Sequence, residues 1–400
     1  CSSQYSLFDS SQSMGPYLKI KNATIYTMAG QVLENSDILC ENGKIKEVGN
    51  IAASADVEID ATGLVVIPGI IDAHSHIGTM DTKTDTHDNN EMTQPATPDV
   101  SIVYGFDPEG ADVKRALRAG ITTVGLAPGS GNVVGGEVVA MKTYGTNPFD
   151  MVVKRPIALK CATGFNPKNV YGPKDQRPLT RMGIAQIMID LLLDGQQYME
   201  KKQLAAEGKG EAPDYNSGLE LVEKVLRREI PLKMHSGGFD MLTGIEIANR
   251  FNVLLTLDHA SGAGHFAKEI AEANVFGIIG GPWGGPAHMV GEGKRNSAYD
   301  VVECHRRGVT CAIMTDGPIL KQDALIYEAG EAVRLGLSVE DALAMLTIHA
   351  AKIILCDDRL GSIEPGKDAD FAIFRGTPAL DTNATVMYTI SGGNIAYQRQ

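Results

Sequence analysis

Five apolar stretches of this sequence carry side chains that can bind a metal ion or transfer a proton. These side chains are His74, His76, Lys160, His235, His259 and Asp316. His74 and His76 stand two positions apart, so on a β-strand both imidazoles point to the same side and can reach one ion. A set of imidazoles with a carboxylate is typical of sites in which divalent ions activate water.

Each of these residues also has an ordinary structural interpretation. A single buried histidine is most often hydrogen-bonded within a core, and Asp316 after an apolar strand can simply begin the next helix. Lys160 is harder to explain, because a buried ammonium group is costly unless it is paired or chemically altered. A carbamate on its Nζ would remove the charge and supply oxygens that bridge metal ions. All six together favour one converging site over chance placement in a core.

The elements that must position these side chains are short buried strands, which alternate with amphipathic helices from Ile70 onward. The predicted strands are Ile70–His76, Ile121–Leu126, Glu137–Thr143, Pro156–Cys161, Pro231–Ser236, Val253–His259, Val275–Gly280 and Val309–Asp316. The repeats predict an α/β fold of the (β/α)8 TIM-barrel type, in which the carboxyl ends of the strands form the functional face. A doubly wound sheet is the alternative, but Ile70–Gly78 lacks its glycine-rich phosphate turn.

The chain divides into four regions. Residues 1–16 are rich in serine and predict a mobile tail. Residues 17–68 alternate in hydrophobicity like β-strands, residues 69–357 contain the barrel repeats, and residues 358–400 turn to strands again. We expect the two β regions to join in one small composite β-sandwich beside the barrel.

Composition excludes several kinds of protein. The 400 residues include 36 Lys and Arg against 49 Asp and Glu, a net charge of −13 that disfavours binding to nucleic acid. The apolar runs are too short to span a bilayer. Scattered cysteines without a CxxC motif fit a reducing compartment and favour a cytoplasmic location. The chain starts at Cys1, which leaves an exported lipoprotein as the alternative.

Two motifs resemble those of the amidohydrolase superfamily. Val66–His76 (VIPGIIDAHSH) is similar to its first-strand motif, and Gly361–Asp370 (GSIEPGKDAD) to its closing motif. Lys142–Gly145, Asn166–Lys168 and Pro231–Lys233 resemble the imidazolonepropionase-like and prolidase-like branch. The resemblance covers about residues 17–400 and implies a (β/α)8 barrel with a composite sandwich and one or two divalent metal ions.

The resemblance also implies how the ions are held. His74, His76 and Asp316 would bind one ion, His235 and His259 the other, and a carbamylated Lys160 would bridge them. Zn²⁺ is expected from the ligand types, with Mn²⁺ or Fe²⁺ as alternatives.

The sequence departs from this branch at residues expected to touch the substrate. After His235, where related proteins often carry a second His and an Arg, the sequence is Ser-Gly-Gly-Phe-Asp; Phe165 replaces a common Glu, and Gly317 a common His. A pocket without these groups favours a substrate less anionic than a free dipeptide carboxylate.

Four further residues are weaker candidates for substrate contact. Asn132 lies in a glycine-rich loop, His87 in the acidic loop 81–91, and His265 shortly after His259. Trp283 belongs to the segment 280–293, which has the composition of a lid that excludes water.

These features predict a metal-dependent hydrolase that cleaves an amide-type C–N bond in a small molecule, such as a cyclic amide, an N-acyl amino acid or a dipeptide. Asp316 would take a proton from the attacking water and pass it to the leaving nitrogen. One alternative is a deaminase of an amino-heterocycle, with Asp240 as its acid, one metal ion and no carbamate. Another is a metal-free binding or assembly protein on the same fold. We also expect a homo-oligomer.

Overall fold

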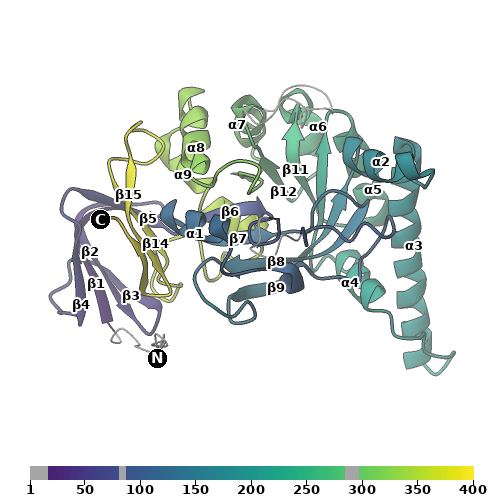
Figure 1. Cartoon of the computed structure of the whole chain (residues 1–400), viewed down its shortest axis with the longest axis horizontal. Coiled ribbons are helices and arrows are strands. Elements are labelled where there is room, and N and C mark those ends of the chain that lie inside the picture. The colour runs from purple at the N-terminus through teal and green to yellow at the C-terminus, as the bar shows by residue number, and fades with distance from the viewer. Residues whose placement is uncertain (1–16, 81–86, 284–296) are drawn as a thin grey trace, which may run out of the picture.

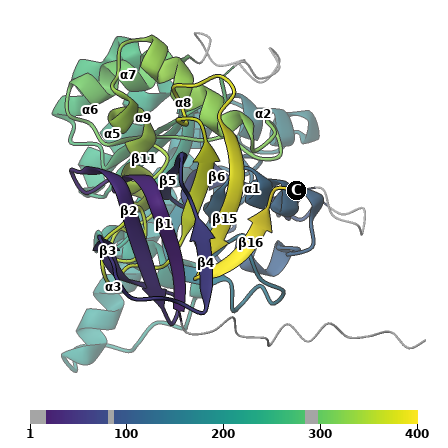
Figure 2. The ribbon, with the colours of Figure 1, turned by 90° about the vertical axis from the view of Figure 1, so that its left-hand side faces the viewer.

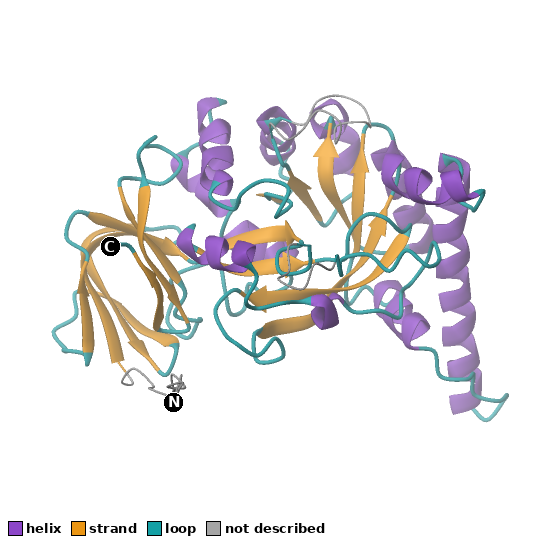
Figure 3. Cartoon of the chain, viewed as in Figure 1, coloured by secondary structure: helices purple, strands orange, loops and turns teal. Residues whose placement is uncertain are grey.

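The computed structural model describes residues 17–80, 87–283 and 297–400 as two packed parts, a small β-sandwich and a larger barrel (Figure 1). The predicted tail 1–16 and most of the predicted lid 280–293 lie outside the described residues. Figure 3 shows the helices on the outside of the barrel strands. The prediction of an α/β barrel with a sandwich is therefore confirmed.

The barrel sheet has the strand order β6-β7-β8-β9-β10-β11-β12-β13. Its strands are β6 (Ile70–Ser75), β7 (Ile121–Leu126), β8 (Val134–Lys142), β9 (Val152–Ala162), β10 (Leu232–Gly237), β11 (Leu255–Ser261), β12 (Gly277–Gly280) and β13 (Cys311–Ile313). Next to β13, the Thr315 amide and hydroxyl donate to the carboxylate of Asp72 on β6, at 3.3 and 2.6 Å. The His76 amide donates to Gly317 O at 2.7 Å, so the first and last strands also meet.

Strand β8 departs from the expected arrangement. The sequence predicts Glu137–Thr143 as one of eight strands in repeating strand–helix units, but β8 runs antiparallel to both β7 and β9. Its connections, residues 127–133 and 143–151, contain no helix. Both are shorter than the dozen or so residues that a crossover between parallel strands needs. The loop 127–133 therefore stays at the mouth, beside the end of β7.

Helices cover the outside of the barrel, as the predicted alternation of strands and helices requires. They are α1 (Ala111–Arg118), α2 (Phe165–Tyr171), α3 (Arg181–Ala206), α4 (Ser217–Leu226), α5 (Asp240–Phe251), α6 (Ala267–Glu272), α7 (Ala298–Arg306), α8 (Ala324–Arg334), α9 (Val339–Ala344) and α10 (Ile348–Ile353), with 3₁₀ turns at Ile102–Gly105, Gly172–Lys174 and Ala263–Phe266. None of the helices in the described ranges combines the length and apolarity needed to cross a membrane.

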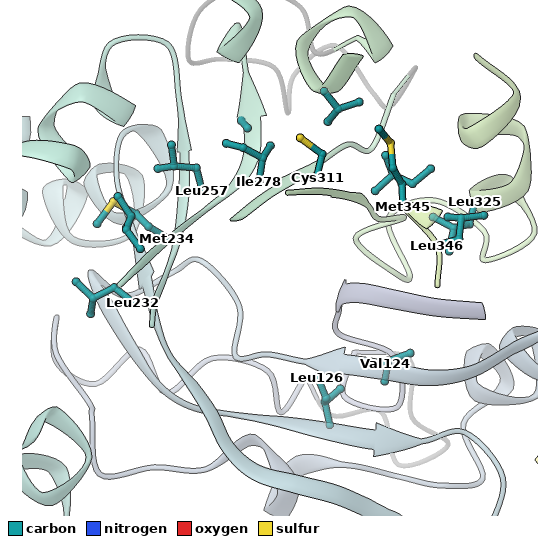
Figure 4. Close-up of a cluster of buried hydrophobic side chains, with 14 of the residues drawn as sticks. Val124, Leu126, Leu232, Met234, Leu257, Ile278, Cys311, Leu325, Met345 and Leu346 are labelled. Carbon is teal, nitrogen blue, oxygen red and sulfur yellow. The ribbon is translucent and has the colours of Figure 1, made fainter. Parts of the chain in front are cut away.

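Alternation along the strands sorts apolar from chemical side chains. Leu232 and Met234 on β10 are buried in the hydrophobic layer that continues through Leu257, Ile278 and Cys311 on the following strands (Figure 4). The residues between them on β10, Lys233 and His235, face the opposite side of the sheet. Because the apolar side chains pack into the hydrophobic layer, the polar side chains that alternate with them point into the barrel.

The sandwich sheet combines both ends of the chain in the order β16-β15-β14-β5-β1-β2-β3, with β4 paired to β1 (Figure 2). Its strands are β1 (Tyr17–Tyr26), β2 (Val32–Glu41), β3 (Lys44–Gly49), β4 (Val57–Asp60), β5 (Leu64–Pro68), β14 (Phe371–Arg375), β15 (Thr385–Ser391) and β16 (Asn394–Gln398). The join is the antiparallel pair β5 and β14. Because β5 leads directly into β6, this pairing anchors the first ligand-bearing strand.

The closing motif 361–370 makes an ion cluster between the sandwich and the barrel. The Asp368 carboxylate accepts from Lys142 of β8 at 3.0 Å and from Arg359 at 2.9 Å, and it also pairs with Lys44 of β3. Asp370 pairs with the same Lys142 and accepts from the Gly392 amide at 2.7 Å. The acidic residues of this motif therefore hold the two parts of the protein together, away from the barrel mouth.

We predict that Asp368→Asn destabilises the protein by about 1–3 kcal/mol, because it neutralises the buried carboxylate that pairs with Lys142, Lys44 and Arg359. Burial raises the pKa of Asp368, but Lys142, Lys44 and Arg359 outweigh this and lower it to about 2. The stabilisation is therefore present above about pH 4 and is lost as the pH falls toward 2. Urea unfolding at pH 7 and pH 3 measures both effects, with Glu331→Gln in the exposed Arg334 pair as the control.

Candidate active site

The six predicted metal-site residues come together at the barrel mouth from strands that are far apart in the sequence. His74 lies next to the end of β6, and His76 directly follows that strand. The others are Lys160 on β9, His235 on β10, His259 on β11 and Asp316 after β13. His259 and Asp316 have positive φ angles of 64° and 54°. A non-glycine residue adopts this backbone conformation at a cost, and such residues are concentrated at functional sites.

Three ligand atoms form a compact triangle. The Nε2 atoms of His74 and His76 are 3.3 Å apart, and they lie 3.2 and 3.1 Å from Oδ1 of Asp316. Ligands bound to Zn²⁺ at about 2.0–2.2 Å in tetrahedral geometry stand about 3.3–3.5 Å from one another. The three residues thus already have the spacing of one face of a metal coordination shell.

Contacts at the Nδ1 atoms of the two histidines orient the Nε2 lone pairs toward the centre of the triangle. The Nδ1 atom of His74 lies 2.5 Å from Asp258 Oδ2, and that of His76 lies 2.7 Å from Ala127 O. With both Nδ1 atoms donating, both Nε2 atoms present lone pairs to Asp316. Oδ1 of Asp316 is buried and has no hydrogen-bond partner in the described part of the chain. Three such atoms in contact require a cation or a proton between them, so these side chains fit a divalent metal ion.

A second pair of histidines lies next to this triangle. The rings of His235 and His259 are 3.9 Å apart between centroids, and the rings of His259 and His74 are 5.3 Å apart. His259 Nε2 is 3.9 Å from Oδ2 of Asp316, the oxygen that does not face His74 and His76. Asp316 therefore lies between the two groups of imidazoles and can bind on both sides.

Lys160 joins the second pair through one hydroxyl group. Its Nζ donates to Pro128 O at 2.8 Å and to Ser130 Oγ at 3.2 Å, and Ser130 Oγ is 2.8 Å from His235 Nδ1. Lys160 is completely buried, and neither hydrogen-bond partner is charged. Burial lowers the pKa of its ammonium group to about 8. A substantial fraction of the amine is then neutral near pH 8, the form that can react with carbon dioxide.

Burial also controls the charge of the imidazoles. It lowers the pKa of His259 to about 3 and that of His76 below its usual value. Burial, together with the neighbouring His259 and Lys160, lowers the pKa of His235 well below the usual range. For Asp316, burial acts to raise the pKa, but the surrounding imidazoles outweigh it and hold the pKa well below normal. At neutral pH, His76, His235 and His259 are therefore neutral and Asp316 is ionised, the forms that bind metal ions.

The four weaker candidates for substrate contact differ in their burial and in their hydrogen bonds. The Asn132 amide donates to Glu91 O at 2.7 Å and to Thr97 Oγ1 at 2.9 Å and accepts from Tyr171, so it fastens the loop before β8. His87 and His265 are exposed. The Trp283 amide donates to Glu328 Oε1 at 2.7 Å, while its buried indole Nε1 has no hydrogen-bond partner among the described residues.

Asp258, Lys233 and Ser130 are site residues that the sequence reasoning did not select. Asp258 directly precedes His259, and a carboxylate inside an otherwise apolar strand was the signal that could have identified it. Lys233 lies in the segment Pro231–Lys233, which was compared with the branch only as a whole, and Ser130 lies in the glycine-rich loop of Asn132. Their roles depend on contacts between strands, which no local pattern reveals.

Comparison with known proteins agrees with the fold and the site. Residues 196–397 match the Amidohydrolase family. The crystal structure of an amidohydrolase from Thermotoga maritima is 35% identical, covers 96% of this chain and 100% of its own, and superposes with a TM-score of 0.89. An imidazolonepropionase from Geobacillus thermodenitrificans is 26% identical over 91% of both chains. Amidohydrolase tasK from Hapsidospora irregularis is 25% identical over 89% of this chain, which spans only 39% of that relative's length.

A barrel with imidazoles and a carboxylate at its mouth and a sandwich built from both chain ends defines an enzyme that acts on carbon–nitrogen bonds. The chain belongs to the amidohydrolase family. The resemblance predicted from the two end motifs is therefore confirmed.

We predict that His76→Ala abolishes binding of a metal ion at the triangle, because it removes one of three converging ligands. Added Zn²⁺ should raise the melting temperature of the unaltered protein, since a ligand at 100 times its Kd stabilises by about 2.7 kcal/mol, and should have little effect on His76→Ala. His305→Gln, on helix α7, is the control and should respond like the unaltered protein. An equal response from His76→Ala would contradict the assignment.

Proposed function

We propose that this enzyme is a metal-dependent hydrolase that cleaves an amide-type C–N bond in a small molecule. The observation that carries the proposal is the triangle of His74, His76 and Asp316, with atoms 3.1–3.3 Å apart and an Asp316 oxygen that lacks a hydrogen bond. An assembly protein without a metal has no physical need for buried acceptors that face one another. Metal analysis of protein prepared without chelators tests this alternative directly.

His74, His76 and Asp316 would hold the first ion, and His235 and His259 the second. Lys160, carbamylated on Nζ, would supply an oxygen to each. When bound, the ions would lower the pKa of a water molecule and polarise the scissile carbonyl. Zn²⁺ is the ion most consistent with histidine and carboxylate ligands, and Mn²⁺ or Fe²⁺ are alternatives that the same analysis distinguishes.

Asp316 would carry the proton in the reaction. Its Oδ1 faces His74 and His76, and its Oδ2 is 3.9 Å from His259 Nε2. One oxygen can therefore accept a proton while the other keeps its contact with an imidazole. The carboxylate would remove a proton from the attacking water and deliver it to the leaving nitrogen as the C–N bond breaks. The barrel interior around it is buried, which keeps bulk water from competing for this proton.

The substrate class follows from what faces the mouth. Gly317 follows Asp316, and Gly237 and Gly238 follow the β10 ligand, so these described positions beside the ligands carry no cationic side chain. The buried Lys160 and Lys233 are engaged with protein oxygens. A neutral cyclic amide or an N-acyl compound therefore suits the site better than a dipeptide that needs a cation for its carboxylate.

Deamination of an amino-heterocycle is the second candidate, and one contact weakens it. Asp240, the acid available for that reaction, is buried at the start of α5, where its Oδ1 and Oδ2 accept from Arg181 Nε at 2.9 and 3.1 Å. A carboxylate held by a guanidinium is a poor proton donor. Ammonia release from amino-heterocycles, compared with hydrolysis of cyclic ureides and acylated amines, separates the two activities.

We predict that Asp316→Asn lowers turnover by about 10²–10⁴-fold, the usual contribution of a positioned acid–base group, while the protein still binds metal through its imidazoles. Steady-state kinetics and metal analysis of the same sample measure both effects. Asp190→Asn, at an exposed position of α3, is the matched control. Near-normal turnover in Asp316→Asn would defeat the proposed role.

We predict that ¹³C-labelled bicarbonate produces one carbamate resonance in the carbon NMR spectrum of the protein, and that Lys160→Met removes it. Removal of carbon dioxide should lower activity, and added bicarbonate should restore it. Lys19→Met, which alters a buried lysine of the sandwich, should keep the resonance. A spectrum without the resonance in the unaltered protein would favour a single-metal site.

A further inference from the structure

A second buried lysine, Lys233, lies beneath the proposed metal site and has no part in the mechanism described above. Its Nζ is 2.6 Å from Asp258 Oδ2 and donates to Ala73 O at 3.1 Å. The side chain of Lys233 is only 3% exposed and that of Asp258 is fully buried. Lys233 starts on β10, reaches Asp258 on β11, and contacts β6 at Ala73, the residue before His74. It therefore links the strands that carry His235, His259 and His74.

Asp258 transmits this contact to a ligand. Its Oδ2, which Lys233 holds, also accepts from His74 Nδ1 at 2.5 Å, and its Oδ1 accepts from Thr256 Oγ1 at 3.0 Å. The carboxylate is thus fixed on both oxygens. A carboxylate that holds Nδ1 of a ligand histidine determines the orientation of the ring and the direction of its Nε2 lone pair.

We propose that Lys233 is a positioning residue of the metal site, which orients His74 through Asp258 and sets the spacing between the strands of the two histidine groups. This inference rests on the proposed function, because it assigns Lys233 a role toward the ion that His74 would bind. Among the described residues, Lys233 makes no hydrogen bond or ion pair with the six predicted ligands, and its effect passes through Asp258 and the Ala73 carbonyl.

The neighbouring Lys160 shows why the two buried lysines have different roles. Lys233 and Lys160 are register partners on the adjacent parallel strands β10 and β9. Lys160 contacts only a carbonyl and a hydroxyl, whereas Lys233 contacts a buried carboxylate. An amine that binds a carboxylate as an ammonium is not available to form a carbamate. The ion pair therefore leaves Lys160 as the reactive amine and retains Lys233 as a fixed cation.

The test measures Co²⁺ binding, which needs no substrate. Metal-free protein is titrated with Co²⁺ against a chromophoric chelator, and the visible absorption of the bound ion reports its coordination geometry. We expect Lys233→Met to weaken Co²⁺ binding by about 10–100-fold, the usual effect of losing an outer-shell partner, and to change the absorption spectrum. The double variant Lys233→Met/Asp258→Asn should bind about as weakly as Asp258→Asn alone, because both changes break the same connection.

Lys19→Met is a matched control, because Lys19 is also a buried lysine and lies 3.4 Å from a carboxylate, Asp37, in the sandwich. It should lose stability but keep the Co²⁺ affinity and spectrum of the unaltered protein. If Lys233→Met does not fold, Lys233→Gln and Asp258→Asn replace it, and unchanged affinity in either one would overturn the inference.

The outcomes separate this inference from the proposed function. If the unaltered protein binds Co²⁺ and Lys233→Met binds it within twofold and with the same spectrum, Lys233 is only a structural ion pair and the inference fails alone. If the unaltered protein binds no Co²⁺, both the inference and the proposed metal-dependent function fail. Weakened binding with an altered spectrum, confined to the Lys233 and Asp258 variants, supports the positioning role.

Discussion

Lone-pair repulsion among three buried ligand atoms is the constraint on which the rest of this site depends. The Nε2 atoms of His74 and His76 converge with Oδ1 of Asp316, which has no hydrogen-bond partner among the described residues. Such an arrangement is stable only around a positive charge. Holding these three atoms together costs free energy elsewhere in the protein. Asp316 and His259 have left-handed backbone conformations, and several charged side chains are buried nearby.

The surrounding structure offsets this cost by leaving few buried charges without a partner. Asp258 is shared between Lys233 and His74, and the Asp72 carboxylate is satisfied by Thr315. Lys160 differs, since it is fully buried with only neutral acceptors. Burial without a carboxylate partner lowers the pKa of Lys160 to about 8 and leaves part of the amine neutral, the form that reacts with carbon dioxide. This is the physical basis for expecting a modification at Lys160 and not at Lys233, which is paired with a carboxylate.

The sandwich contributes to the site although it lies at the other end of the barrel. Strand β5 pairs with β14 and continues directly into β6, so the sandwich fixes the start of the strand that carries His74. Asp368 and Asp370 attach the C-terminal segment to Lys142 on β8. The two end motifs of the sequence therefore serve different purposes: the first supplies ligands, and the last holds the barrel against the sandwich.

The sequence by itself determined the fold class, the family and the residues that meet at the mouth, because alternating apolar strands and the spacing of His74 and His76 are local patterns. It did not predict the antiparallel direction of β8, because the hydrophobic pattern of a strand is the same whichever way the strand runs. The short connections on either side of β8 determine its direction. Nor did the sequence predict that Asn132 fastens a loop, or that Lys233 reaches Asp258 on the neighbouring strand. These features arise from distances between segments that are remote in the chain, and only the folded barrel sets those distances.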